Sequence, residues 1–156
     1  MPTMKEAASE FLSHKRIAIT GVSRKPKGHG SNAVFKRLRD RGYQVFAVNP
    51  NADKVEGACC YHDLRSIPGG VDAVVIATAP DKAEGTMREC VELGIKHVWM
   101  HRAYGQGSVS LTAAAYGRKH GITVIAGGCP LMFDPAADLG HKFMRMTLAS
   151  RISKAV

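Results

Sequence analysis

The residues best suited to chemistry lie in one glycine-rich stretch, residues 16–32. Its first part, residues 16–20, is a β-branched run that predicts a buried strand. Gly21 follows and allows a sharp turn that brings backbone N–H groups close to a ligand. Ser31 and Asn32 are residue types that cap helices, and the free N–H groups at a helix start favour an anion. The stretch therefore predicts a phosphate-binding loop between a strand and a helix.

Three basic residues in this loop, Arg24, Lys25 and Lys27, support that prediction. Cationic side chains beside small residues suit a phosphate group. The glycines at 21, 28 and 30 depart from the compact G-x-G-x-x-G spacing of dinucleotide enzymes. An ordinary strand–loop–helix connection would explain the glycines alone, so the basic side chains decide in favour of phosphate.

Length and composition indicate one domain over residues 1–156 that meets an acidic ligand. The 22 Lys and Arg residues against 13 Asp and Glu give a net charge of +9, which favours an anionic partner. The sequence shows no helix-turn-helix or zinc-finger pattern and few aromatic residues, so nucleic acid is not expected. No apolar run approaches a membrane span, and residues 1–15 do not resemble a signal peptide. Four cysteines without a C-x-x-C pair fit a reduced, cytoplasmic setting.

Strand-like and helix-like segments alternate along the chain, which is typical of an α/β fold. We predict a doubly wound parallel sheet of about five strands in the order 3-2-1-4-5, with helices on both faces. The strands are expected from residue 17 and at 43–48, 72–78, 97–100 and 122–126. Helices are expected at about 4–12, 32–41, 81–93 and 111–120 and after Asp134–Pro135, and the irregular stretch 55–68 as a small helix or two.

The carboxyl ends of parallel strands meet at one edge, so the loops that follow them converge there. The crevice is expected near the first and fourth strands, where the order in which the chain adds strands to the sheet reverses direction. Thr78, Ala79 and Pro80 follow the third strand, His101 ends the fourth, and Cys129 follows the fifth.

The exit of the second strand distinguishes between nucleotides. NAD sites place an acidic residue there to bind the ribose hydroxyls. This chain has the neutral turn Asn49–Pro50–Asn51 instead, which favours a nucleotide with an additional phosphate, such as coenzyme A (CoA) or NADP. An ordinary turn is the other interpretation, since Asn and Pro are common turn formers.

Several short motifs together resemble the CoA-binding-domain family: residues 19–23, 48–51, 57, 60–61, 67–68, 72–76 and 128–130. These are stand-alone Rossmann proteins similar to the amino-terminal CoA-binding domain of the succinyl-CoA ligase alpha subunit. The resemblance covers residues 17–130, with the motifs in order. It implies a Rossmann-like fold and CoA as the ligand.

The resemblance also implies a role for each matching residue. Gly21, Val22 and Ser23 would lie against the phosphate and ribose, Ser31 near the helix start, and Asn49–Asn51 beside adenine or its ribose. Thr78, Ala79 and Pro80 would line a wall of the site, and Cys129–Pro130 would match a Cys-Pro near the pantetheine. The full set of expected CoA-binding residues is Gly21, Val22, Ser23, Arg24, Lys27, Ser31, Asn49, Pro50, Asn51, Thr78, Ala79, Pro80, His101, Cys129 and Pro130.

Few residues are suited to catalysis. His101 is the one acid/base group expected near the crevice, and it has no evident partner carboxylate. Cys129 follows a strand at the crevice edge, where its thiol could meet that of CoA, although an ordinary buried cysteine is the favoured interpretation. No metal site is expected, because no histidine pair shows zinc spacing.

The sequence therefore predicts a CoA or acyl-CoA binding protein, monomeric or homodimeric, without its own catalytic set. The alternative is an NADP-linked oxidoreductase or a CoA-ligase-like subunit that needs a partner chain.

Overall fold

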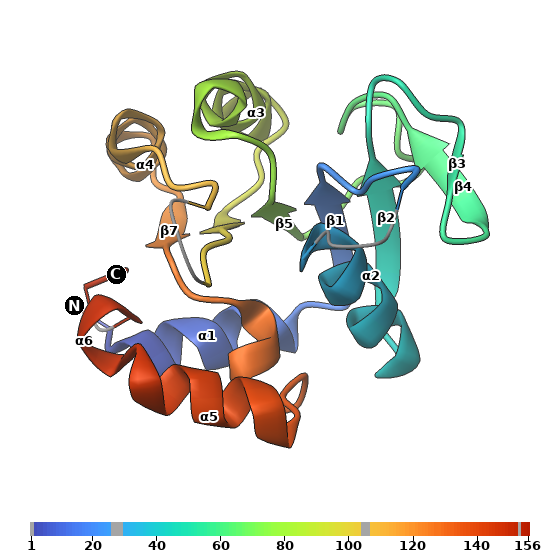
Figure 1. Cartoon of the computed structure of the whole chain (residues 1–156). Coiled ribbons are helices and arrows are strands. Elements are labelled where there is room, and N and C mark those ends of the chain that lie inside the picture. The colour runs from blue at the N-terminus through green and yellow to red at the C-terminus, as the bar shows by residue number, and fades with distance from the viewer. Residues whose placement is uncertain (1, 26–29, 104–106, 153) are drawn as a thin grey trace.

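A seven-stranded sheet forms the centre of the computed structural model, which describes residues 2–25, 30–103, 107–152 and 154–156. Helices cover its two faces (Figure 1). The strands are β1 (Arg16–Thr20), β2 (Gln44–Val48), β3 (Lys54–Val55), β4 (Ala58–Tyr61), β5 (Ala73–Ile76), β6 (His97–Met100) and β7 (Thr123–Ala126). The helices are α1 (Met4–Ser13), α2 (Gly30–Asp40), α3 (Pro80–Glu92), α4 (Leu111–Lys119), α5 (Leu139–Thr147) and α6 (Ala149–Ile152), with a 3₁₀ turn, η1, at Pro130–Met132.

The order of the strands is β3-β4-β2-β1-β5-β6-β7. All neighbours pair in parallel except β3, which forms a short antiparallel hairpin with β4. The predicted α/β fold with a doubly wound sheet is confirmed. The prediction of five strands, in which residues 72–78 pair with residues 43–48 at the edge of the sheet, is wrong. Strand β5 pairs with β1 instead, and the strand that pairs with the other side of β2 is β4.

Strand β4 was not predicted from the sequence because it is short and pairs with β2 over little of its length. The stretch was expected to be helical, yet Ala58–Tyr61 forms a strand that matches β2 at only two positions, Ala47↔Cys60 and Val48↔Tyr61. Counting β4, the six parallel strands follow the order 3-2-1-4-5-6 of doubly wound sheets. The reversal therefore lies between β1 and β5, and not beside residues 97–100.

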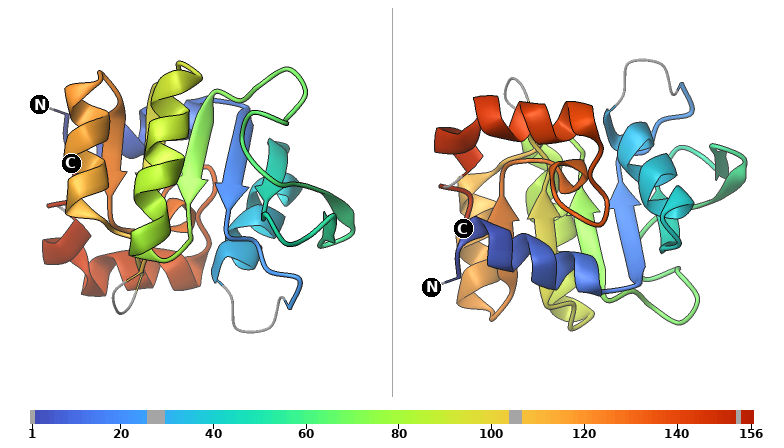
Figure 2. Two further views of the ribbon diagram at one scale, coloured as in Figure 1. Left: turned by 90° about the horizontal axis from the view of Figure 1, so that it is seen from above. Right: turned by 90° about the horizontal axis from the view of Figure 1, so that it is seen from below.

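Two cores, one on each face, hold the layers together. Phe11 of α1 and Phe35 of α2 pack with Trp99 of β6 in the first core, while Met87 of α3 and Met100 of β6 lie in the second. Figures 1 and 2 show α3 and α4 on one face and α1, α2 and α5 on the other. Strand β5 is buried along its whole length, as its apolar sequence predicts.

Two predicted helix starts are displaced by one or two residues. Helix α2 begins at Gly30, so Ser31 and Asn32 lie inside its first turn and do not cap it. Helix α3 begins at Pro80 after Ala79, and Asp81 lies in its first turn. Proline suits this place because the first helical residues need no N–H donor.

The last predicted helix begins later than Asp134–Pro135, at Leu139, with Asp138 as its cap. In the described part of the chain, no helix has the length and apolar character needed to cross a membrane.

The single tryptophan, Trp99, offers a test of the first core. Its ring is fully buried, packs edge-on against Phe11 with centroids 5.3 Å apart, and its Nε1 donates to Gly127 O at 2.9 Å. Trp99→Phe leaves that carbonyl unpaired and a cavity beside it, so we expect unfolding free energy to fall by about 2–4 kcal/mol. Urea denaturation followed by circular dichroism measures it. A loss below about 0.5 kcal/mol would contradict this packing.

Candidate functional site

The candidate site begins where β1 and β5 end beside each other. Gly21 has φ +74°, and a Cβ built there would lie 2.6 Å from Ala77 O. Its N–H donates to Val48 O at 3.0 Å, so Gly21 also joins the end of β2. Glycine is therefore required here for the meeting of three strands. A β-carbon here would clash with the backbone of Ala77, so a larger residue disturbs the fold as well as any ligand.

Asn32 holds the loop that follows Gly21. This buried side chain accepts a hydrogen bond from Ser23 N at 2.9 Å and donates to Ser23 O at 2.8 Å and to Glu56 Oε1 at 2.9 Å. Ser31 Oγ donates to Gly21 O at 2.9 Å. The first turn of α2 thus holds the loop through its side chains and positions Ser23 and Arg24.

Asn49 performs the corresponding task at the end of β2. Its Nδ2 donates to Val22 O at 2.9 Å, and its Oδ1 accepts from Asn51 N at 2.8 Å. The side chain therefore ties the first loop to the turn at Pro50 and shapes that turn. The segment is a turn, which both interpretations of it require, and the turn also lines two cavities.

A cavity of about 540 Å³ opens at this edge between the ends of β1, β2 and β5 and helix α3. Of the expected residues it is lined by Gly21, Asn49, Pro50, Asn51, Thr78 and Ala79. Leu64 and Val48 supply apolar walls, while Lys82 and Glu89 add charge. The cavity thus lies at the reversal point of the sheet, where doubly wound folds bind ligands.

Two further cavities flank the first. The second, about 450 Å³, is lined by Ser23, Arg24, Lys25, Asn49 and Asn51 and shares both asparagines with the first. The third, about 240 Å³, shares Ala77, Thr78 and Ala79 with the first and is also lined by Gly30, Ser31, His101 and Ser108. The three cavities form a row along the carboxyl edge of the sheet.

Thr78 lies where the first and third cavities meet. Its Oγ1 is buried and has no hydrogen-bond partner among the described residues. A buried hydroxyl without a partner costs free energy, so a ligand atom that bonds with it would gain.

Five expected residues lie away from these cavities or outside the described chain. Val22 is buried in the first core and contributes only its carbonyl, and Pro80 begins α3. Cys129 and Pro130 are buried where η1 begins. Lys27 falls outside the residues that the structure describes.

Cys129 does not open onto the crevice edge. Its side chain is buried in the first core, and burial raises the pKa of its thiol to about 12. A protonated, enclosed thiol does not exchange disulfides readily. The favoured interpretation, an ordinary buried cysteine, agrees with the structure.

His101 lies in the third cavity as the sequence predicts. Its ring is close to α2, since a Cβ on Gly30 would lie 3.3 Å from His101 Cε1. Burial, with a smaller effect of His141, lowers its pKa to about 4, so the imidazole is neutral at pH 7. Among the described residues, no group of three His, Cys, Asp or Glu side chains lies close enough to hold a metal ion.

Some residues that shape the site were not expected from the sequence. Asn32, taken there as a helix cap, is the clamp of the loop, and its buried position was not visible from the residue type. The first cavity is also lined by Lys82 and Glu89 of α3 and by His62 and Asp63, which follow β4. The sequence did not resolve the segment after β4.

The fold and its cavities define a Rossmann-like domain whose candidate site lies at the reversal point of the sheet. The chain belongs to the CoA binding domain family, whose profile matches residues 15–135.

Relatives and solved structures agree with this assignment. The chain is 28% identical to the acetate–CoA ligase (ADP-forming) II alpha subunit of Pyrococcus furiosus, over 92% of this chain and 33% of that protein. It is 30% identical to protein YneT of Bacillus subtilis, over 82% and 91%. A hypothetical protein from Pyrococcus horikoshii OT3 has a similar structure, with a TM-score of 0.74 at 29% identity over 81% and 87%. The chain thus spans one third of the ligase subunit and most of the shorter relatives.

Replacing the loop clamp should release the loop without unfolding the sheet. Asn32→Ala removes two hydrogen bonds to the Ser23 backbone. We therefore expect the unfolding free energy to fall by about 1–3 kcal/mol and trypsin to cleave faster after Arg24. Mass spectrometry of the fragments over time measures the rate. Asn51→Ala, at an exposed position, serves as the control, and equal rates in the two variants would contradict the clamp.

The pKa of His101 predicts an acid-sensitive fold. Its ordinary value of 6.5 applies to the unfolded chain and about 4 to the folded one, so unfolding takes up a proton below pH 6.5. Stability should therefore fall as the pH drops from 6.5 to 5, by up to about 2 kcal/mol, above the range where carboxylates titrate. His101→Gln should flatten the dependence of the melting temperature on pH in this window.

A second histidine gives the comparison. Burial and His14 lower the pKa of half-buried His97, so His97→Gln should flatten the same curve to a smaller extent. Equal slopes for the unchanged protein and His101→Gln would mean that His101 is not buried as described.

Proposed function

We propose that this protein binds CoA or an acyl-CoA in the row of cavities along the carboxyl edge of its sheet. The observation that carries the proposal is the pairing of a basic cavity with a larger, partly apolar one that shares Asn49 and Asn51 with it. CoA has the matching character, because its phosphates carry roughly four negative charges while its adenine and pantetheine are largely uncharged.

The second cavity suits the phosphates. Arg24 and Lys25 line it, and among the described residues its lining includes no carboxylate. Membership of the CoA binding domain family supports this assignment, since the basic loop lies within the matched residues 15–135. Phosphate groups would here meet fixed backbone held by Asn32 as well as mobile cationic side chains.

The first and third cavities suit the rest of the ligand. Val48, Pro50 and Leu64 offer apolar surface for a flat base or a methylene chain. The buried Thr78 Oγ1 lies between the two cavities and supports a polar contact there, such as a pantetheine amide. Neutral His101 and Ser108 line the third cavity and would accept an uncharged acyl end.

A binding role is the simplest chemistry for these residues. His101 faces the third cavity, yet the described residues include no carboxylate partner for it, and Cys129 is enclosed. A second candidate, a ligase-like subunit that acts with a partner chain, is supported by the alignment to the P. furiosus ligase subunit over 92% of this chain. That subunit is three times as long, so the ligase activity would need residues from elsewhere.

Ligand choice provides the first test. We expect CoA to raise the melting temperature, and dephospho-CoA and NAD to raise it less, because each lacks a phosphate that Arg24 and Lys25 would bind. NADP is the fourth ligand compared, since it also carries an additional phosphate. Differential scanning fluorimetry at matched concentrations measures all four, and equal stabilisation by NAD would overturn the CoA proposal.

Removal of the positive charges of the loop provides the second test. Arg24→Ala with Lys25→Ala should weaken CoA binding by about 10- to 100-fold and reduce its salt dependence, since two cationic contacts are lost. Lys54→Ala with Lys119→Ala, two exposed lysines away from the cavities, makes the same change in net charge. Isothermal titration calorimetry compares the pairs, and equal weakening by the two would leave only a general charge effect.

A further inference from the structure

The turn that joins β3 and β4 breaks a local preference. Glu56 and Gly57 form it with φ values of +48° and +72°, and in the described chain Glu56 is the one residue other than glycine with a positive φ. Two-residue turns with two positive φ values favour Asn-Gly or Asp-Gly, because short polar side chains tolerate this conformation better than Glu does. A strained residue of this kind points to a task for its side chain.

The Glu56 side chain reaches the buried amide group that holds the basic loop. Its Oε1 accepts a hydrogen bond from Asn32 Nδ2 at 2.9 Å. The same nitrogen donates to Ser23 O at 2.8 Å, and Asn32 Oδ1 accepts from Ser23 N at 2.9 Å. Asn32 is 1% exposed, so an N–H left without a partner there would cost free energy. Arg39 Nη1 also donates to Glu56 O at 2.9 Å, so the turn is attached to α2 by its backbone as well.

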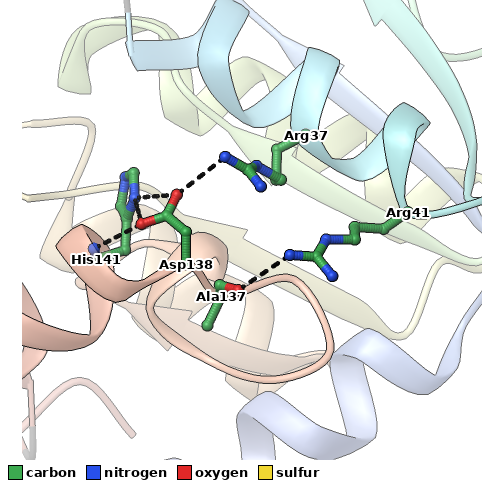
Figure 3. Close-up of polar contacts among 5 residues, drawn as sticks. All are labelled: Arg37, Arg41, Ala137, Asp138 and His141. Carbon is green, nitrogen blue, oxygen red and sulfur yellow. Dashed lines mark hydrogen bonds and ion pairs between the residues drawn. The ribbon is translucent and has the colours of Figure 1, made fainter.

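Helix α2, which carries Asn32, is a fixed support for this contact. Figure 3 shows Arg37 and Arg41 reaching from α2 toward the residues that precede α5. Arg37 Nη2 pairs with Asp138 Oδ2 at 3.2 Å, and Arg41 Nη2 donates to Ala137 O at 3.3 Å. The position of the loop clamp therefore follows from the body of the fold.

One segment of the chain holds the basic loop at two places. The segment runs from the exit of β2 through the β3–β4 hairpin. Asn49, at its start, donates from Nδ2 to Val22 O at 2.9 Å. Glu56, at the tip of the hairpin, acts on Ser23 through the clamp. Two successive residues, directly before the basic side chains of the loop, are thus held by the same segment.

We propose that Glu56 is a positioning residue for the ligand, and that through Asn32 it holds the backbone of the basic loop in the conformation that binds phosphate. This inference rests on the proposed binding of CoA, because Ser23 and Arg24 line the second cavity and Glu56 does not. A loop that is already held in its bound conformation loses less entropy when the ligand binds. The length of the Glu56 side chain matters here, and its negative charge does not attract an anionic ligand.

Two substitutions separate length from charge. Glu56→Asp keeps the charge and suits the positive φ better, but it is one methylene shorter and cannot reach Asn32 Nδ2. Glu56→Gln keeps the length and an acceptor oxygen and removes the charge. In isothermal titration calorimetry we expect Glu56→Asp to weaken CoA binding by about 5- to 20-fold and Glu56→Gln to change it by less than about 3-fold. Because Asp favours the turn, weaker binding would not come from a weaker hairpin.

Other orders of affinity would overturn the proposal. Unchanged affinity in Glu56→Asp, or a loss in Glu56→Gln as large as that in Glu56→Asp, would mean that the contact with Asn32 does not support binding. A role of the charge alone would appear as tighter binding by Glu56→Gln and no effect of Glu56→Asp. Cys59→Ala, at an exposed position of the same hairpin, is the matched control and should bind CoA as the unchanged protein does.

The action through Asn32 has a test that does not need CoA. Trypsin should cleave after Arg24 about 3- to 10-fold faster in Glu56→Asp than in the unchanged protein, and at the unchanged rate in Glu56→Gln. In an Asn32→Ala background, Glu56→Asp should add less than about 1.5-fold, because its partner is already absent. Additive effects in the double variant would overturn the coupling. If the unchanged protein does not bind CoA, the proposed function fails, while the trypsin rates still decide whether Glu56 holds the loop.

Discussion

The site depends on one steric constraint, the close approach of Gly21 to the backbone of Ala77. A β-carbon at residue 21 would lie 2.6 Å from Ala77 O, so the ends of β1 and β5 can meet only through glycine. The same residue bonds with Val48 O, and Thr20 Oγ1 accepts from Ala77 N at 3.2 Å. The ends of three strands are thereby fixed around one position. All three cavities open within a few residues of it, so the geometry of the site follows from this contact.

The sequence predicted the elements whose burial leaves a strong pattern. Strand β5 is apolar on both faces because helices cover both faces of the sheet, and glycine ends α2 at Gly42 with φ +87°. Strand β4 left no such pattern, since it pairs with β2 at two positions and lies near the edge of the sheet. Its omission changed the neighbours of β5 and so misplaced the reversal point, although the set of converging loops was right.

Within the site, the sequence indicated which loops meet but not what each side chain does there. The side chains of Asn49 and Asn32 both form hydrogen bonds with the backbone. Asn49 bonds with Val22 O, and Asn32 bonds with the N–H and the carbonyl of Ser23. Side-chain amides can bind ligand or backbone equally well, and only the folded geometry decides. The position of Cys129 was hard to predict for a related reason, because residues after a strand can turn inward as well as outward. In this chain η1 directs Cys129 into the core.

The net charge of +9 needs the same distinction between structural and ligand-binding groups. Arg16 donates to Gly70 O and Pro68 O, and Arg118 to Val124 O and Ala155 O, so these guanidinium groups satisfy carbonyls of the fold itself. Arg24 and Lys25 differ, because their side chains make no ion pair among the described residues and they line a cavity. These two cationic side chains therefore lie beside a loop whose backbone is held by Asn32. This placement, more than the total charge, supports the proposal that the first loop binds an anion.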